Sequence, residues 1–578
     1  MASTAPALRM PSGPSEAALD RAARQPVLFA ALPKRSDLLR LGAQESAAVV
    51  TMHVHRNHSF EHVASAMAPF AGFAGLDVRL EYGDYDDSLA MDDAPDADVE
   101  LVWLDWSRYG TSRTPADLAE WLRSRVMTRR PLTESPILVA GAPAADPAGV
   151  GLTAELEKAL ASVPAVHVCD LASIGRQLGD RLFDTRAARL SGTPLSDAAC
   201  VLAARLFGLR WIPSVVRPPL KAVVVDLDDT LYRGVLGEDG AGGVELSDAH
   251  RDLQARLVSL REAGMFIAVA SRNEAGDVEE LFATRTDFPL RREHLSACEV
   301  SWEPKADAIR RVASQLRIGT DAVVFLDDNA GELAAVAADV PRIATLHAGA
   351  DPAVTLRALD LFPGLWRWRR SEADAVRIQD LAASREREAL AATAADPLAY
   401  LASLQPHLLY GLNPGRHLSR LHELSVKTNQ FNLALARLAE AEVARRIAAP
   451  DHVVVSVRLS DRLTDSGLIA AIFGRRDGDT LVVEELCISC RALGRRLEDL
   501  LIGEAIARMT AATGTSRVVM RYALGSRNAP ARAWLARAVA QPLGPGAGEI
   551  PFPWSGSSHA ALVSALPVTI DMEPDDGA

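Results

Sequence analysis

The sequence predicts an α/β protein built around a parallel, doubly wound sheet. Short apolar runs, typical of strands covered on both faces, occur at residues 223–225, 265–270 and 322–326. Segments with helical character occur between and around them, at 249–263, 275–283 and 305–315. Strands that alternate with helices form parallel sheets, and ligands bind where the carboxyl ends of such strands meet.

Acidic residues directly follow the first of these runs, in the motif Asp226-Leu-Asp228-Asp-Thr230. Two carboxylates separated by one residue can project over the same sheet edge if the backbone stays extended. Their repulsion would be relieved by a bound Mg²⁺ ion, which prefers hard oxygen ligands. An acidic strand-to-loop junction without chemistry is the competing interpretation of this motif when it stands alone.

Further polar residues follow in a fixed order along the chain. Ser271 ends the second apolar run, Lys305 precedes a helical segment, and Asp327 and Asp328 end the third run. Because the sheet is expected to be parallel, we expect these side chains to converge with Asp226 on one crevice.

This ordered set, over residues 219 to 345, resembles the haloacid dehalogenase superfamily of phosphotransferases. The resemblance implies that Asp226 is a nucleophile that accepts the phosphoryl group and that Asp228 acts as general acid and then base. It implies that Ser271 binds a phosphoryl oxygen, and that Lys305 neutralises the developing charge and steadies Asp226. It also implies an Mg²⁺ site formed by Asp226 and Asp228 with Asp328, and with Asp327 as the alternative to Asp328.

Residues 226–240 more specifically resemble the opening motif of the FkbH-like proteins, a branch of that superfamily found in polyketide biosynthesis. Those proteins normally have Asn at the place of Asp229, Trp at the place of Tyr232 and Lys at the place of Arg272. These departures leave the catalytic carboxylates untouched and bear on which substrate is used. The run Lys-Thr-Asn-Gln-Phe-Asn at 427–432 also matches that family.

Length and composition indicate a large modular protein of about three or four domains. The 578 residues are 48% hydrophobic, with a net charge of −13 and five cysteines. The negative charge argues against general nucleic-acid binding, and the cysteines are too few for a disulfide framework. We expect neither a signal peptide nor a membrane-spanning segment, and therefore a cytoplasmic location.

The first part of the chain is predicted to be a loose tail over residues 1–25, followed by a second α/β domain over 26–215. Its clearest strand candidates lie at 48–52, 99–104 and 136–140. In the FkbH-like proteins this region resembles a hydrolase-like α/β fold. The sequence has no convincing Ser-His-Asp set here, so we expect a structural or docking role. A proline-rich stretch at 212–219 predicts a linker to the phosphatase-like domain, which is expected over 219–362.

Three histidines, His53, His55 and His58, form a conspicuous cluster in this first domain. His53 and His55 would face the same side of a strand, as metal ligands do. No cysteine or carboxylate completes a ligand set at convincing spacing, so we favour a polar cluster at a strand end.

The last third is predicted to begin after a boundary near 363–370, with a solvated connecting helix over 371–400 and an α+β domain over 401–570. Strand candidates lie at 453–457, 467–473 and 481–486, and a helix candidate lies at 497–509. Between the last strand and this helix lies the turn 487–495, with Arg491, Gly494 and Arg495. A basic, glycine-containing turn before a helix is a plausible anion cradle.

This turn resembles the pyrophosphate loop of the N-acetyltransferase fold, in which Arg491 and Gly494 fit the pattern and Arg496 replaces a small residue. That departure favours the phosphopantetheine arm of a carrier protein over coenzyme A, with Arg491 and Arg495 meeting its phosphate. Cys490 occupies the Ser-Cys-Arg position of the FkbH-like pattern and is our candidate for a catalytic thiol. Asn528 matches a late motif of the same family and is expected at the edge of the site.

FkbH-like proteins are understood to take 1,3-bisphosphoglycerate and deliver a glyceryl unit to an acyl carrier protein. The resemblance thus implies a bifunctional Mg²⁺-dependent phosphatase and glyceryl transferase, with a phosphorylated three-carbon acid and a carrier protein as partners and with neither nucleic acid nor membrane. Two alternatives remain open. One is a phosphatase or acyl transferase for another acyl phosphate, and the other is a carrier-docking module without catalysis.

Overall fold

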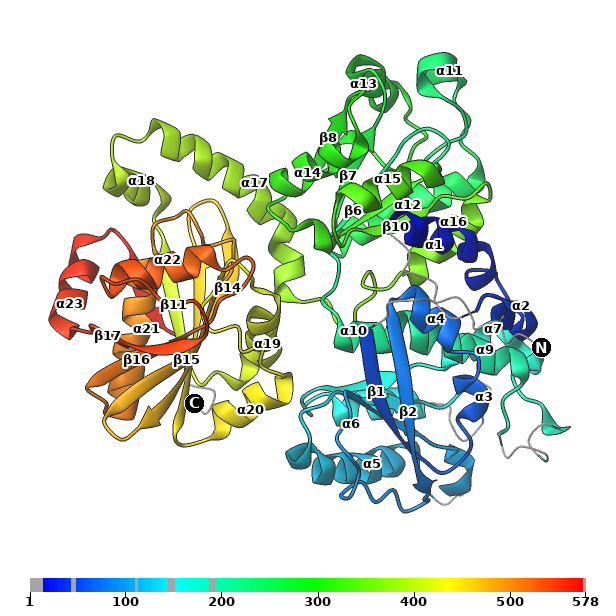
Figure 1. The fold of residues 1–578 in the computed structure, drawn as a ribbon, viewed down its shortest axis with the longest axis horizontal. Helices are drawn as coiled ribbons and strands as arrows, with labels where there is room; N and C mark the ends of the chain where they lie inside the picture. Colours follow the sequence, from blue (N-terminus) through cyan, green and yellow to red (C-terminus); the bar gives the residue numbers. More distant parts are fainter. Residues whose placement is uncertain are drawn as a thin grey trace, which may run out of the picture. The chain divides into compact units, whose positions relative to one another are not determined.

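The computed structural model describes residues 14–42, 48–109, 113–143, 151–186, 189 and 193–574. The chain divides into two compact units, Met1–Arg369 and Arg370–Ala578 (Figure 1). This division falls inside the stretch 363–370, where the sequence analysis expects a boundary.

The middle of the first unit is a five-stranded sheet in which every neighbouring pair is parallel. Its order is β10-β9-β6-β7-β8, with β6 at Ala222–Val225, β7 at Phe266–Ser271, β8 at Ala297–Val300, β9 at Val323–Asp327 and β10 at Ala344–His347. The helices between these strands are α11 (Leu236–Gly243), α12 (Asp248–Glu262), α13 (Ala275–Thr284), α14 (Lys305–Gln315) and α15 (Ala330–Asp339). The predicted doubly wound sheet is therefore confirmed, and the strand order reverses between β6 and β9.

A second parallel sheet lies N-terminal to it in the same unit, with the order β2-β1-β3-β4-β5. The strands are β1 (Ala48–Arg56), β2 (Leu76–Tyr85), β3 (Val99–Trp103), β4 (Ile137–Ala140) and β5 (Val166–Cys169). Their helices include α2 (Arg35–Arg40), α3 (Glu61–Ala64), α4 (Ala68–Phe73), α5 (Pro115–Arg129), α6 (Leu152–Leu160), α7 (Ala172–Leu178) and α9 (Asp197–Leu206). The strands predicted at 48–52, 99–104 and 136–140 are confirmed, whereas β2 and β5 are additional.

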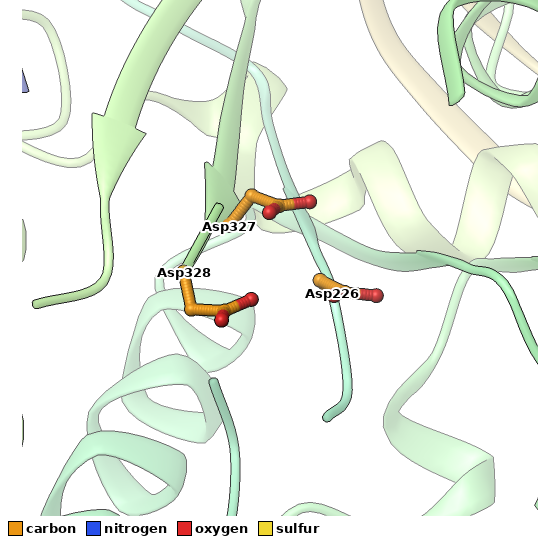
Figure 2. Close-up of side chains that lie close together, drawn as sticks. All are labelled: Asp226, Asp327 and Asp328. Atoms are coloured by element: carbon orange, nitrogen blue, oxygen red, sulfur yellow. The ribbon is translucent and has the colours of Figure 1, made fainter. Parts of the chain in front are cut away.

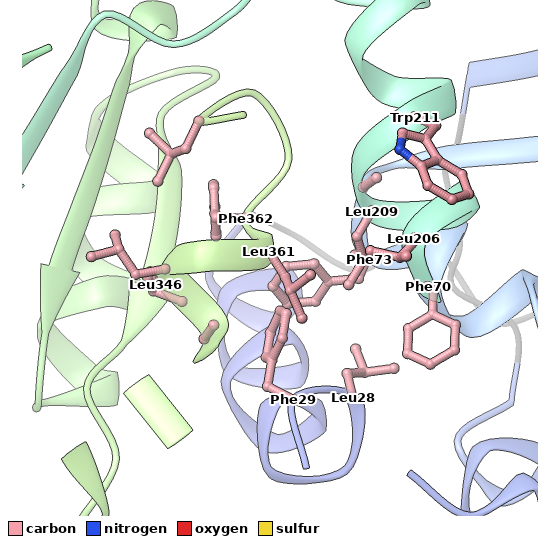
Figure 3. Close-up of a cluster of buried hydrophobic side chains, with 14 of the residues drawn as sticks. Leu28, Phe29, Phe70, Phe73, Leu206, Leu209, Trp211, Leu346, Leu361 and Phe362 are labelled. Atoms are coloured by element: carbon pink, nitrogen blue, oxygen red, sulfur yellow. The ribbon is translucent and has the colours of Figure 1, made fainter. Parts of the chain in front are cut away.

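One hydrophobic core joins the two sheets of the first unit (Figure 3). Phe73 of α4 packs edge-on against Phe29, with ring centroids 5.1 Å apart, and against Phe362, at 6.0 Å. Phe362 directly follows α16 (Pro352–Leu361), which belongs to the middle sheet's half of the unit. Burying large aromatic side chains on both sides of the boundary removes much apolar surface from water. The predicted domains 26–215 and 219–362 therefore fold against each other as one body.

The expected loose tail is wrong for residues 14–25, because they belong to helix α1 (Pro14–Leu28). Gln25 is buried, donates from Nε2 to the carbonyl of His347 (2.9 Å) and accepts the amide of His347 (2.9 Å). The hydroxyl of Ser15 donates to the carbonyl of Ala334 at 3.0 Å. These bonds fix α1 along α15 and β10. Residues 1–13 lie outside the described part of the chain.

The proline-rich stretch predicted as a linker is mostly helix. Helix α9 continues through the π-helical turn η4 (Phe207–Trp211) into α10 (Ile212–Val216), and Pro213 lies directly after this turn, where the regular α-helical hydrogen bonding is interrupted. Within the described residues, 197–216 is the one helical stretch apolar and long enough to cross a membrane, although the sequence analysis expected none. Its most apolar window is 78% buried, as in a core helix, and the cytoplasmic location stays a prediction.

The second unit is built on a mostly antiparallel sheet with the order β17-β16-β15-β14-β13-β11-β18, alongside which β12 pairs with β15. The strands are β11 (His407–Leu412), β12 (Phe431–Asn432), β13 (His452–Ser460), β14 (Asp465–Asp477), β15 (Thr480–Ile488), β16 (Arg517–Tyr522), β17 (Gly548–Phe552) and β18 (Thr569–Met572). The helices are α17 (Glu372–Thr393), α18 (Pro397–Leu404), α19 (Leu418–Lys427), α20 (Glu440–Ala448), α21 (Glu498–Thr513), α22 (Ala529–Ala538) and α23 (Gly556–Ala565). Strands β15 and β16 are parallel, and α21 connects them.

Helix α17 differs from the solvated connector expected from its charged sequence. Three of its charged residues, Asp374, Asp380 and Arg387, are buried. The guanidinium of Arg387 donates from Nε to Asp461 at 2.8 Å, and Asp380 accepts the hydroxyl of Ser466 at 2.7 Å. Charged residues in a helix are therefore not evidence of exposure here, because partners distant in sequence satisfy them.

We predict that Gly208→Ala destabilises the first unit by about 1–3 kcal/mol, as overpacking of a filled core does. Gly208 lies in η4, where an added Cβ would stand 2.7 Å from Cβ of Phe70 and 2.8 Å from the amide nitrogen of Ala71. Gly276→Ala in α13 is the control, since no atom lies within 4 Å of its added Cβ. Urea unfolding measures both. Equal midpoints for Gly208→Ala and the parent would contradict this packing.

Candidate active site

A cluster of three carboxylates lies at the carboxyl edge of the middle sheet. Asp226 directly follows β6, Asp327 is the last residue of β9, and Asp328 comes next. Each contributes one carboxylate oxygen to a group in which all three atoms lie within 4.8 Å of one another. Figure 2 shows the three carboxyl groups gathered in front of the strand ends. Neighbouring parallel strands at the point where the strand order reverses bring these residues together.

Lys305 places its ammonium group between two of these carboxylates. Its Nζ is 2.8 Å from Oδ2 of Asp226 and 2.5 Å from Oδ2 of Asp327. All three side chains are buried, with exposures of 6%, 7% and 0%. Lys305 is the first residue of α14, so the start of that helix sets the position of the charge.

The protonation preferences in the cluster follow from burial and from like charges. Burial, together with Asp327, raises the pKa of Asp226 more than the ammonium of Lys305 lowers it. Burial and then the neighbouring carboxylates raise the pKa of Asp328 to about 6. Burial would lower the pKa of Lys305, but its two carboxylate partners outweigh it and raise the pKa. The site therefore holds more negative charge than its one lysine compensates.

A divalent cation fits this donor set. Oδ1 of Asp226 is enclosed and has no hydrogen-bond partner among the described residues. Asp327 has both oxygens engaged, because Oδ2 meets Lys305 and Oδ1 accepts the amide of Asn329 at 2.8 Å. Asp226 and Asp328 are thus the better placed of the three to bind a hard cation such as Mg²⁺ through oxygen. This agrees with the preference for Asp328 over Asp327 that the sequence suggested.

Asp228 lies near the cluster, but its carboxylate is engaged elsewhere. Oδ1 accepts the hydroxyl of Tyr232 at 2.7 Å and the amide of Leu236 at 3.0 Å, and Oδ2 accepts Nδ2 of Asn273 at 2.9 Å. Its side chain is not part of the group of clustered carboxylates. The expectation that Asp228 is a side-chain metal ligand therefore does not agree with this geometry, whereas a carboxylate fixed by several donors suits proton transfer.

Two further side chains hold the loops of the site. The buried Ser271 at the end of β7 accepts Nδ2 of Asn273 at 3.1 Å. Oγ1 of Thr230 accepts the amide of Asp328 at 3.1 Å and so joins the loop after β6 to the loop after β9. Sequence reasoning assigned no role to Thr230, Tyr232 or Asn273. Their positions within the motifs were the one sign that they could matter. Their bonds to Asp228 and Asp328 could not be inferred from sequence, because these bonds form only when the strands pair.

In the second unit, Cys490 and Arg491 lie in the turn between β15 and α21, as predicted. The Cys490 thiol is half-buried, whereas the nearby Cys487 is fully enclosed in β15, and burial raises its pKa well above the ordinary value. Arg491 has an enclosed Nη1 without a partner among the described residues. Burial and then the neighbouring Arg420 lower the pKa of Arg491 to about 10, which leaves it charged at neutral pH.

Other predicted residues of this turn have structural positions instead. Arg495 is 3% exposed and donates from Nη1 to Asp461 at 2.8 Å, so it is not free to meet a phosphate as expected. Gly494 has the positive φ of +82° that favours glycine. The first turn of α21 carries Glu498 and Asp499, which oppose an anion at that helix start. The anion-binding capacity predicted for the turn is therefore reduced to Arg491.

Asn528 is fully buried and acts as an internal brace. Its Nδ2 donates to the carbonyls of Asn432 and Ala523, both at 3.0 Å, and its Oδ1 accepts the amide of Gly525 at 2.9 Å. Its polar atoms are thus used within the protein, and its place at the edge of a site stays a prediction.

The histidine cluster lies on and after β1, and its residues are buried. His55 contacts Glu100 of β3 at 2.8 Å, and Glu100 also accepts Nη2 of Arg129 at 2.9 Å. Glu100 is the carboxylate that the sequence spacing did not reveal. Among the described residues, the three aspartates are the one group with ligand spacing, so the interpretation of the histidines as a polar cluster stands.

No family model and no curated protein matches this chain. Among solved structures, the N-terminal part of protein BF1531 from Bacteroides fragilis, containing a phosphatase domain complexed with Mg, matches at 21% identity and a TM-score of 0.45, over 61% of this chain and 100% of that one. A HAD family enzyme, BT-2542 from Bacteroides thetaiotaomicron, in complex with magnesium and inorganic phosphate, matches at 14% identity and a TM-score of 0.17, over 22% and 93%. A GNAT family acetyltransferase from Streptococcus pneumoniae matches at 14% identity and a TM-score of 0.17, over 22% and 81%.

The arrangement of the strands confirms the predicted α/β class. The middle sheet is parallel and doubly wound, with acidic residues after β6 and β9. The second unit is an α+β domain, in which α21 joins the parallel strands β15 and β16 within an otherwise largely antiparallel sheet.

We predict that Asp328→Asn raises the unfolding temperature of the metal-free protein at pH 7.5, by about 2 °C or more. The pKa of Asp328 is raised to about 6, so its ionisation opposes folding above that pH, and the opposition fades as the pH falls through 6 toward the ordinary value. Mg²⁺ should stabilise the parent but hardly the variant.

Thermal unfolding between pH 5 and 8, with and without Mg²⁺, measures both effects. Asp252→Asn, an exposed position in α12, serves as the control for simple loss of negative charge. A lower unfolding temperature for metal-free Asp328→Asn, or an undiminished response to Mg²⁺, would contradict the assignment of this site.

Proposed function

We propose that this chain is a bifunctional phosphatase and acyl transferase that takes 1,3-bisphosphoglycerate, removes phosphate and loads a glyceryl unit onto an acyl carrier protein as a thioester. The observation that carries the proposal is the convergence of Asp226, Lys305 and Asp328 at one sheet edge, with Oδ1 of Asp226 unpartnered. A carboxylate oxygen held in place and free of hydrogen bonds is suited to attack phosphorus.

In the phosphatase half, Asp226 and Asp328 would hold Mg²⁺, which supplies Lewis-acid neutralisation of the phosphoryl oxygens when bound. The carboxylate of Asp226 attacks the phosphorus of the alkyl phosphate, and the bond from phosphorus to the substrate oxygen breaks. Asp228 gives that oxygen a proton. Lys305 fixes Asp226 through Oδ2 and offsets negative charge, and Ser271 donates to a phosphoryl oxygen.

Release of phosphate reverses the role of Asp228. A water molecule attacks the phosphorus of the aspartyl phosphate and loses its proton to Asp228. The bond between phosphorus and Asp226 breaks, so inorganic phosphate leaves and both aspartates return to their starting states. The hydrogen bonds from Tyr232 and Asn273 keep the carboxylate of Asp228 in one orientation through both steps.

In the acyl-transfer half, the thiolate of Cys490 attacks the carbonyl carbon of the acyl phosphate, and inorganic phosphate leaves as the carbon–oxygen bond breaks. The thiol of the carrier's phosphopantetheine then attacks the resulting thioester, and Cys490 regains its thiol. The half-buried position of Cys490 and the neighbouring cation of Arg491 support this assignment. Arg491 is the residue we propose for the pantetheine phosphate.

The proposed substrate class follows from the two reactions assigned to this chain, removal of phosphate and transfer of an acyl group. An acyl phosphate is an activated carboxyl group suited to a thiolate, whereas an alkyl phosphate requires a phosphatase. A phosphorylated three-carbon acid that carries both matches the two sites and the FkbH-like motifs. A different acyl phosphate is the alternative, because Asp229, Tyr232 and Arg272 depart from that family's pattern.

We predict that Asp226→Asn lowers phosphate release from p-nitrophenyl phosphate by roughly 10³-fold or more, since removal of a nucleophile costs several orders of magnitude. Asp252→Asn should retain the parent's rate, because this exposed residue of α12 is not part of the carboxylate cluster. Malachite-green assays measure the rates. A folded Asp226→Asn variant with parental activity would refute the phosphatase assignment.

We predict that Cys490→Ala abolishes acyl loading of a phosphopantetheinylated carrier protein and leaves phosphate release from p-nitrophenyl phosphate intact. Mass spectrometry of the carrier after incubation with the bisphosphate should show one glyceryl group in place of one hydrogen. Cys298→Ser, a cysteine of β8 in the first unit, is the control and should load normally. Undiminished loading by Cys490→Ala would remove this thiol from the mechanism.

A further inference from the structure

The N-terminal sheet has a pocket at the place where doubly wound sheets bind ligands. Its order β2-β1-β3-β4-β5 reverses direction between β1 and β3, and ligands bind outside the carboxyl ends of the strands at such a point. A shallow depression, partly open to solvent, lies there. His58 follows β1, Asp105 follows β3, Gly141 follows β4 and Leu171 follows β5. Four consecutive strand ends therefore contribute to its walls.

Hydrogen bonds between the loops fix the shape of this pocket. The side chain of Asn57 accepts the amide of Asp105 at 2.7 Å and so ties the loop after β1 to the loop after β3. Nε1 of Trp106 donates to the carbonyl of Ala140 at 3.3 Å, which joins the loop after β3 to β4. At Gly141 an added Cβ would stand 2.5 Å from Oγ1 of Thr153, so the backbone passes where a side chain would not fit. The pocket is thus preformed.

The lining is mostly apolar, and His58 is its buried polar member without a partner. Trp103, Trp106, Phe183 and Leu195 contribute large apolar surfaces. The ring of His58 stacks on that of Trp103, with centroids 5.3 Å apart and an interplanar angle of 22°. The His58 residue is 5% exposed, and its Nδ1 has no hydrogen-bond partner in the described part of the chain. Native proteins rarely leave a buried polar group without a hydrogen-bond partner.

The residues that line the pocket offer no free charge to a ligand. Burial, followed by weaker effects from nearby charged groups, lowers the pKa of His58 to about 4, so the imidazole is neutral at pH 7. The carboxylate of Asp105 is occupied, because Oδ1 accepts both the amide and the hydroxyl of Ser107 and Oδ2 lies 3.6 Å from Nε of Arg108. An ion entering this space would lose its hydration without gaining a counter-charge.

We propose that this pocket binds a small uncharged molecule with a mostly apolar body and one hydroxyl or carbonyl group, which hydrogen-bonds to the imidazole of His58. Such a molecule satisfies the imidazole and covers the apolar wall together. Its lining shares no residue with the carboxylate cluster or with the turn of Cys490, so it gives the N-terminal sheet a binding role of its own.

Ligand-observed ¹⁹F NMR on the full chain tests this with three probes: 4-fluorobenzyl alcohol, 4-fluorotoluene and 4-fluorobenzoate. The alcohol should bind, the toluene should bind more weakly, and the benzoate should not bind. His58→Phe keeps a ring on Trp103 but removes both nitrogens, so it should weaken alcohol binding by roughly 2- to 10-fold, to the level of the toluene. His167→Phe is the matched control, because His167 also stacks on a tryptophan, Trp368, but does not line the pocket.

Leu195→Trp should abolish binding of all probes, because the larger side chain fills the pocket. This variant keeps His58, so it tests the proposal even if His58→Phe does not fold. The proposal is overturned if the parent binds none of the uncharged probes, if benzoate binds as well as the alcohol, or if folded His58→Phe or Leu195→Trp binds the alcohol like the parent. All readouts are binding measurements, so their failure would leave the phosphatase and transfer assignments untouched.

Discussion

The candidate active site depends on one buried ammonium group placed between two carboxylates. Lys305 begins helix α14, where the helix dipole disfavours a cation, and burial disfavours it further. The close carboxylates of Asp226 and Asp327 offset these two costs. The ammonium in turn reduces the repulsion between the two buried carboxylates, so both can lie close together in the interior. A third, Asp328, remains uncompensated, and this leaves the site suited to a divalent cation rather than to a second lysine.

The sheet topology explains why these groups meet. Strands β6 and β9 are neighbours although about a hundred residues separate them, and the amide of Asp226 donates to the carbonyl of Leu326 at 2.9 Å. The backbone hydrogen bonds between β6 and β9 therefore continue as far as Asp226. Beyond the strands, the bond from the amide of Asp328 to Oγ1 of Thr230 links the two loops. His347 at the end of β10 contacts the carbonyl of Asp328 at 2.8 Å. Because Gln25 of α1 binds the backbone of His347, the N-terminal helix also supports the far side of this loop.

Local patterns in the sequence were sufficient for the strands and motif positions of the middle sheet. Valine-rich runs identify β6 and β9 because such strands are buried on both faces, and the order of Asp226, Ser271, Lys305 and Asp328 predicts their convergence. The errors concern contacts between distant segments. The burial of Arg387 and Arg495 depends on Asp461, and the helical state of residues 14–25 depends on docking against α15 and β10. The residues themselves resemble surface and tail sequence, so no local pattern distinguishes these cases.

The departures from the FkbH-like motif can be judged by the bonds that the substituted residues make. Tyr232 stands where that family has tryptophan, and its hydroxyl donates to Asp228, as an indole N–H is chemically able to do. Asp229, in place of asparagine, adopts a φ of +50° and accepts the amide of Gly234 through Oδ1, a role that an asparagine oxygen also performs. Arg272, in place of lysine, pairs with Glu332 at 2.7 Å. In each case the polar function at the position is kept while the side chain's shape changes. Under the proposed function, the departures change side-chain shape while the hydrogen bonds that hold the carboxylate of Asp228 remain in place.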